Sequence, residues 1–152
     1  RLYFMTLVEL LQIIASLLGS LGFAILFNIR GKRLLLASLG GMLSWFLFIL
    51  CNRIIGNDVI AYFIVSAIIS IYAEIMARKL KTPTTTFIIT SMIPMIPGGS
   101  LYYTMVTAFR SNSTDFVLRG THTMELAAAL ALGVVVVTTA TRMFHKTISR
   151  DA

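Results

Sequence analysis

Three carboxylates lie within or beside long apolar stretches of this sequence, and they are the residues best suited to proton chemistry. Glu9, Glu74 and Glu125 are among only six acidic residues in 152. Ionisable side chains are costly inside a bilayer, and those retained there tend to mark ion or proton pathways. We therefore predict proton coupling for all three. A plainer interpretation stays open for two of them, because Glu125 would also favour a helix N-terminus and Glu9 could reach the membrane surface.

Polar residues recur at every fourth position through one of these stretches, from Tyr62 through Ser66, Ser70 and Glu74 to Arg78. At about 100° per residue such a row drifts by only about 40° per step, so it forms one slowly winding stripe on a helix. We predict that the two serines line a substrate path. Glu74 and Arg78 stand in the orientation that stabilises a helix, and a structural ion pair is the expected role of Arg78.

The segment 91–105, SMIPMIPGGSLYYTM, is apolar but contains the strongest helix breakers in the chain, Pro94, Pro97, Gly98 and Gly99. A proline removes one backbone donor and clashes with the carbonyl four residues earlier. Backbone groups left unpaired in hydrocarbon survive only where they are buried in protein or line a wet cavity. The segment therefore predicts a discontinuous helix with a polar cavity halfway across the bilayer. A simple proline kink, satisfied by neighbouring helices, is the alternative.

The residues after the break are suited to binding an anion. Ser100 is expected to cap the second half-helix, and the amides of residues 99–102 would direct their positive end into the cavity. Half-helix N-termini bind substrate carboxylates in secondary transporters. The expected substrate-binding residues are Pro97, Gly98, Gly99, Ser100, Tyr102, Ser66, Ser70 and Thr90.

The sequence gives little support for metal binding, nucleic-acid binding or catalysis. His122 and His145 lack the spacing of a metal motif, Cys51 stands alone, and no catalytic residue, metal or cofactor is expected. The net charge of +7 lies in short clusters between apolar runs, so we expect no nucleic acid as a partner. A membrane-embedded lipid enzyme would need clustered Asp, His or Cys, which the sequence does not offer.

The elements that must position these residues are membrane-spanning helices. The chain is 57% hydrophobic and 12% charged, whereas soluble domains are about one-quarter charged. A hydrocarbon core about 30 Å thick needs about 20 apolar residues. We predict one all-α transmembrane domain over 1–152 with five spanning helices, the fourth discontinuous at Pro94, Pro97, Gly98 and Gly99. The predicted helices are 5–27, 34–51, 59–77, 87–109 and 122–144, and residues 113–120 are predicted as a short interfacial helix or a loop.

Lys and Arg predict the orientation. One side of the bilayer would hold nine of them, namely Arg30, Lys32, Arg33, Arg78, Lys79, Lys81, Arg142, Lys146 and Arg150. The other would hold four, namely Arg1, Arg53, Arg110 and Arg119. Because cytoplasmic loops carry the excess, the N-terminus is expected outside and the C-terminus in the cytoplasm. Small residues such as Gly19, Gly22, Gly40 and Gly41 are expected at close helix contacts.

The segment 73–105, AEIMARKLKTPTTTFIITSMIPMIPGGSLYYTM, resembles the signature region of the bacterial threonine/serine exporter family. That signature has an A-E-x-x-A-R element, then P-T-T, then I-P-x-x-P-G-G-x-x-Y. The positions that carry over are Glu74, Arg78, Pro83, Pro94, Pro97, Gly98, Gly99 and Tyr102, with Ser100 at the third position of the glycine run. The chain's length and helix number resemble the small subunit of the family's split, two-component form.

The resemblance implies a secondary exporter of small carboxylate metabolites in a bacterial inner membrane. Threonine and serine are the substrates in some members, and a dicarboxylate such as succinate is suggested for the split form. It also implies a larger partner subunit. An odd number of helices fits this, because five-helix units of opposite orientation build inverted repeats, and self-association is a second way to complete the cavity. The rival function is a membrane scaffold subunit in which the broken helix serves packing alone.

Overall fold

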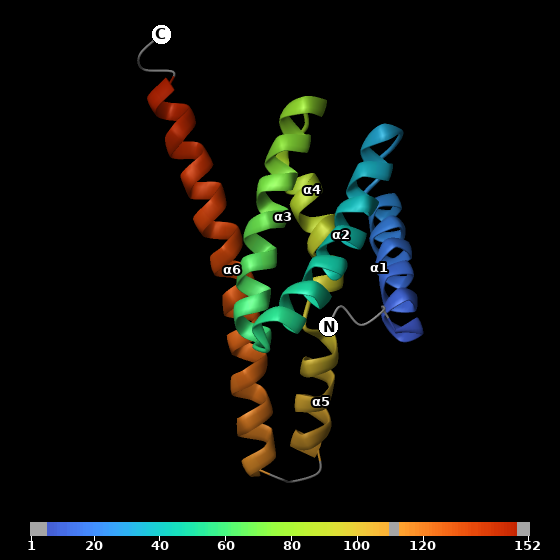
Figure 1. Cartoon of the computed structure of the whole chain (residues 1–152), viewed down its shortest axis with the longest axis vertical. Helices are drawn as coiled ribbons and strands as arrows, with labels where there is room; N and C mark the ends of the chain where they lie inside the picture. The colour runs from blue at the N-terminus through green and yellow to red at the C-terminus, as the bar shows by residue number, and fades with distance from the viewer. Residues whose placement is uncertain (1–5, 110–112, 149–152) are drawn as a thin grey trace.

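The computed structural model describes residues 6–109 and 113–148, with side chains described up to Met143. Every regular element in these residues is a helix (Figure 1). In chain order they are α1 (Leu7–Leu26), α2 (Lys32–Ile55), α3 (Asp58–Leu80), α4 (Thr84–Met92), the 3-10 helix η1 (Ile93–Met95), α5 (Gly98–Phe109) and α6 (Ser113–Ile148).

The helices confirm the predicted all-α membrane fold. Among the described residues, four are long and apolar enough to cross a bilayer: α1, α2, α3 and the part of α6 from Ser113 to Met143. The predicted fourth span is divided into α4 with η1, an apolar stretch over Thr84–Met95, and the separate helix α5. The large apolar side chains on the outer faces, such as Leu26, Ile54 and Phe109, suit a lipid or protein environment.

Local signals fix the ends of the first three helices. Thr6 and Glu9 form a reciprocal capping box at the start of α1, and the Asn57 side chain accepts a hydrogen bond from the Ile60 amide at the start of α3. Gly56 ends α2 at φ 68°, a left-handed conformation that glycine adopts without steric cost. Lys81 ends α3 in the same region at φ 49°.

The prediction for residues 113–120 and the start of the last helix was wrong. These residues are neither a separate helix nor a loop, because α6 runs without interruption from Ser113 to Ile148. No proline breaks this stretch, and the Thr123 hydroxyl anchors its early part to α5 through Thr104, at 3.1 Å. At about 1.5 Å per residue α6 is about 54 Å long, well beyond the thickness of a hydrocarbon core.

Close helix contacts occur at only some of the predicted small residues. A side chain at Gly40 would collide with Ser91, and one at Gly41 would collide with Ser20, so both glycines let α2 approach its neighbours. Gly133 does the same for α6, because a Cβ there would come within 2.7 Å of the Phe63 carbonyl oxygen on α3. Gly19 and Gly22 have open space around them, so the contact predicted for them is absent from the described structure.

Successive helices alternate in direction except for α4 and α5, which run the same way, and two ends of the bundle can be told apart (Figure 1). We call the end at which α1, α3 and α6 terminate the basic end, because Lys32, Arg33, Arg78, Lys79 and Arg142 lie there. At the opposite end, α5 and the first turns of α6 form a hairpin that projects past the start of α3.

The broken helix restarts near this opposite end instead of halfway along α3. The Ser100 hydroxyl contacts that of Thr123 at 2.9 Å, and the neighbouring His122 lies 4.0 Å from Asp58, the first residue of α3. Relative to α3 the helix therefore restarts near one end, and the depth of the break in the bilayer stays a prediction. Sequence spacing alone could not place the restart relative to α3, because that position depends on how α4 packs between α2 and α3.

Candidate functional site

The interruption between α4 and α5 is short. Pro94 lies in the single 3-10 turn of η1, Ile96 is extended, and α5 begins at Gly98. The Leu101 amide donates to the Pro97 carbonyl at 2.9 Å, which starts the helix two residues before Ser100. Ser100 is therefore the third residue of α5, and the expectation that it caps this helix was wrong.

The start of α5 leaves backbone donors open. The Gly98 amide donates to the Ile96 carbonyl at 2.6 Å, but the amides of Gly99 and Ser100 have no acceptor among the described residues. Both glycines are exposed, and a Cβ added to either would meet nothing within 4 Å. Unpaired amides at a helix N-terminus form a site for anions, since the helix dipole adds positive potential there.

Hydroxyl groups hold α5 against α6 beside these amides. The Ser100 and Thr123 hydroxyl oxygens lie 2.9 Å apart, and those of Thr104 and Thr123 lie 3.1 Å apart. The Thr104 hydroxyl also donates to the Ser100 carbonyl at 2.9 Å. The cluster fixes the orientation of the half-helix, so the open amides have a defined position relative to α6.

This arrangement predicts an efficient disulfide between two introduced cysteines. In a Cys51→Ser chain, the pair Ser100→Cys and Thr123→Cys should crosslink under mild oxidation, because a disulfide needs β-carbons roughly 3.5 to 4.5 Å apart. Tyr102→Cys with Thr123→Cys is the matched control, since Tyr102 is 64% exposed on another face of α5. Mass spectrometry of the unreduced protein measures both yields. Equal crosslinking of the two pairs would contradict the α5–α6 arrangement.

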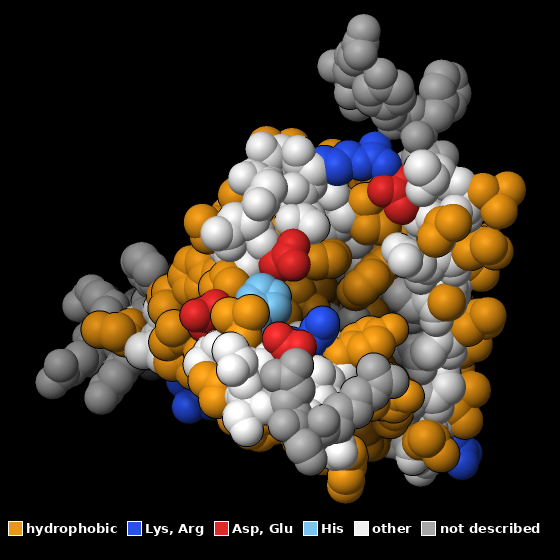
Figure 2. Space-filling model, turned by 90° about the horizontal axis from the view of Figure 1, so that it is seen from below, with side chains coloured by type: hydrophobic (Ala, Val, Ile, Leu, Met, Phe, Trp, Pro, Cys, Tyr) orange, Lys and Arg blue, Asp and Glu red, His pale blue; other side chains and the backbone are white. Residues whose placement is uncertain are grey.

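A polar pocket of about 530 Å³ opens beside the start of α5. It is lined by Ser100, Tyr103, Asp115, Leu118, Arg119, His122 and Glu125. Figure 2 looks onto this end of the molecule and shows acidic, basic and histidine side chains around a hollow. We call it the α5–α6 pocket.

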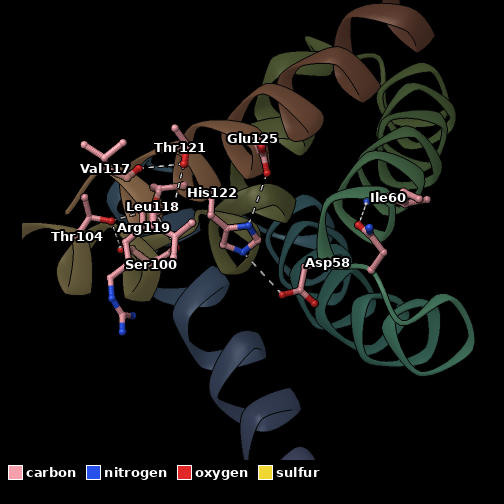
Figure 3. Close-up of polar contacts among 12 residues, drawn as sticks. Asp58, Ile60, Ser100, Thr104, Val117, Leu118, Arg119, Thr121, His122 and Glu125 are labelled. Atoms are coloured by element: carbon pink, nitrogen blue, oxygen red, sulfur yellow. Dashed lines mark hydrogen bonds and ion pairs between the residues drawn. The ribbon is translucent and has the colours of Figure 1, made fainter. Parts of the chain in front are cut away.

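The charges of the α5–α6 pocket have mixed sign. His122 lies between two carboxylates, 4.0 Å from Asp58 on α3 and 3.8 Å from Glu125 on its own helix (Figure 3). The Arg119 guanidinium lies 6.0 Å from the centre of the Tyr103 ring. Such a pocket offers partners to both a carboxylate and an ammonium group.

Glu9 belongs to a different contact at this end. Besides its capping role on α1, its carboxylate accepts a hydrogen bond from Arg53 on α2 at 2.6 Å. The pair ties the start of α1 to the end of α2. The structure does not bring Glu9 together with Glu74, which lies at the basic end.

A second polar pocket, of about 490 Å³, lies at the basic end between α3, α4 and α6. We call it the signature pocket, because it gathers residues of the family signature on one surface. Its lining residues are Glu74, Arg78, Pro83, Thr84, Thr85, Ile88, Thr138, Thr141 and Arg142. Within it, Arg78 lies 3.5 Å from the Glu74 carboxylate.

The remaining expected substrate residues lie apart from both pockets. Ser66, Ser70 and Thr90 are fully buried, and each hydroxyl donates to a carbonyl three or four residues earlier in its own helix. Such internal bonds satisfy hydroxyl groups at helix contacts. A role in lining the path stays a prediction, and it requires these helices to separate. Tyr102 is exposed and packs edge-on against Tyr103, with ring centres 5.4 Å apart.

Sequence reasoning missed several pocket residues on α6. Arg119 and Asp115 were overlooked because their segment was not recognised as part of a long helix. Thr138, Thr141 and Arg142 stand at i, i+3 and i+4, which is one face of a helix, and this spacing could have identified them. Among the described residues, no group of three or more His, Cys, Asp and Glu could hold a metal ion.

A helical bundle that crosses a membrane several times, with a broken helix and polar pockets at both ends, defines a multi-pass membrane protein suited to moving small solutes. Residues 12–140 match the family described as "Threonine/Serine exporter, ThrE". The chain belongs to this family of transporters, which confirms the resemblance seen in the signature segment. No curated protein and no solved structure shows significant similarity to the chain.

Proposed function

We propose that the chain is a subunit of a secondary exporter and that the start of α5 holds the carboxylate of the exported metabolite. The observation that carries this is the pair of open amides at Gly99 and Ser100, in a member of a threonine/serine exporter family. Pro97 and Tyr102 flank these amides and complete the binding segment.

The adjacent α5–α6 pocket favours serine or threonine over a dicarboxylate such as succinate. Its acidic residues, Asp115 and Glu125, would attract the ammonium group of an amino acid but repel a second carboxylate. Arg119 and the open amides would bind the single carboxylate. Protons would drive export through Glu74, together with Glu9 or Glu125.

A larger subunit of the same family is the proposed partner. In the described structure the binding segment is open on one side. At least half of the surface of each of three α5 side chains, Leu101, Tyr102 and Met105, is exposed. A second set of helices would close the site against lipid, as in transporters built from paired repeats. We place the assembly in the bacterial inner membrane, with the N-terminus outside and the basic end in the cytoplasm, because Lys and Arg concentrate there.

The test is efflux of preloaded labelled serine, threonine and succinate from proteoliposomes under an imposed pH gradient. Liposomes would contain this chain alone, the large subunit alone, or both. We expect gradient-dependent efflux of serine or threonine with both proteins. If succinate is the only solute released, the exported substrate is a dicarboxylate and not serine or threonine. Equal efflux by the large subunit alone would favour the scaffold function.

A further inference from the structure

The signature pocket contains an arginine whose charge is not balanced by any neighbour among the residues that the structure describes. The Glu74 carboxylate, whose side chain is 15% exposed, already lies beside Arg78. No ion pair or hydrogen bond among the described residues involves Arg142, which reaches the same pocket from α6. Two guanidinium groups and one carboxylate leave this pocket with an excess of one positive charge.

Neutral donors surround the same space. The hydroxyls of Thr84 and Thr85 make no side-chain hydrogen bond within the described part of the chain, and both line the pocket. These residues also begin α4, whose N-cap, Pro83, supplies no side-chain acceptor. The first turn of α4 therefore adds backbone donors and the positive end of its dipole. Thr138 and Thr141 donate to carbonyls of their own helix, which leaves their oxygens as acceptors.

We propose that the signature pocket is a second carboxylate-binding site, distinct from the start of α5, with Arg142 as its principal ligand. Thr84 and Thr85 donate further hydrogen bonds to the carboxylate, and Glu74 holds Arg78 in place. The ligand class is a small carboxylate, and its identity as the exported metabolite rests on the proposed function. The two sites lie at opposite ends of α6, so the exported molecule meets the signature pocket first from the basic end.

The site can be tested without measuring transport, by the reactivity of a cysteine placed in it. A Cys51→Ser, Thr141→Cys chain in liposomes is modified with an anionic and with a cationic thiol reagent of the same size. The anionic reagent should react faster, because Arg142 attracts it. Serine is added in one experiment and succinate in another, and a solute that binds in the pocket should slow modification of the cysteine. The solute that does so shows whether the site binds an amino acid or a dicarboxylate.

Arg142→Gln is the deciding variant, and Lys79→Gln is its matched control. Lys79→Gln gives the same change of charge at the basic end of the bundle, but Lys79 does not line the pocket. Arg142→Gln removes a charge-assisted hydrogen bond, so the solute concentration that protects the cysteine should rise by about tenfold or more. In Lys79→Gln this concentration should be the same as in the parent chain.

Two results would overturn the site: neither solute protects the cysteine, or the two variants behave alike. Parallel efflux measurements separate this inference from the proposed function. If the chain supports efflux but neither solute protects the cysteine from modification, the second site is refuted and the exporter function stands. If a solute protects the cysteine but the chain supports no efflux, the site is supported and the export function is refuted.

Discussion

A chain carrying Gly99→Leu is expected to lose gradient-driven efflux while still inserting and folding normally. The space around Gly99 is open, so the folded chain can accept the side chain without a clash. Leucine also favours a helix over glycine by about 1 kcal/mol, so α5 should not unwind. The new side chain would instead occupy the space in front of the Gly99 and Ser100 amides. Because each hydrogen bond to a charged group contributes about 1.5 to 3 kcal/mol, efflux should fall by at least about tenfold.

Ala108→Leu is the matched control for this substitution. Ala108 is exposed on the same helix but lies at its far end, away from the open amides. Initial efflux rates, normalised to the amount of inserted protein, would be compared for the two variants. Wild-type efflux in Gly99→Leu would remove the start of α5 from the transport path.

Gly133→Leu should have the largest effect on folding. A Cβ at this position would collide with Ser66 and come within 2.7 Å of the Phe63 backbone oxygen, which cannot rotate away. Overpacking of this kind typically lowers the free energy of unfolding by about 1 to 3 kcal/mol. We expect the upper part of that range, because α3 and α6 would have to move apart.

Thermal unfolding in detergent would measure this loss against Gly19→Leu. Gly19 lies within α1, and nothing approaches the position of its missing side chain. Both variants gain the same helix propensity, so a difference in melting temperature isolates the contact with α3. Identical melting temperatures would show that the α3–α6 contact is looser than the structure indicates.

Length and hydropathy were sufficient to predict the membrane-spanning helices, because a bilayer imposes the same requirement on each of them. They were insufficient for the start of α6. Residues 113–120 were predicted as a short interfacial helix or a loop, whereas in the structure they form the first turns of α6, which pack against α5. The position of the break in the sequence was correctly predicted from Pro94 and Pro97, and its level relative to α3 follows only from the tertiary contacts.

The candidate site was only partly predictable for a related reason. A serine stripe at helical spacing suits a cavity wall and a close helix contact equally well, and Ser66 lies at such a contact against Gly133. The signature segment did bring Glu74 and Arg78 into one pocket. Arg142 is far from them in sequence and adjacent only in the fold.

The uninterrupted length of α6 has a mechanical consequence. Its contact with α3 at Gly133 lies about 12 Å from Glu125 and about 14 Å from Arg142 along the helix axis. The contact at Gly133 can thus serve as the point about which α6 tilts as one rigid helix. A tilt of about 10° around it would displace the two ends by about 2 Å each, in opposite directions. Because the Ser100–Thr123 and Thr104–Thr123 contacts tie α5 to α6, α5 would move together with the first half of α6. A tilt that widens the signature pocket between α3 and α6 would therefore bring His122 closer to Asp58 on α3.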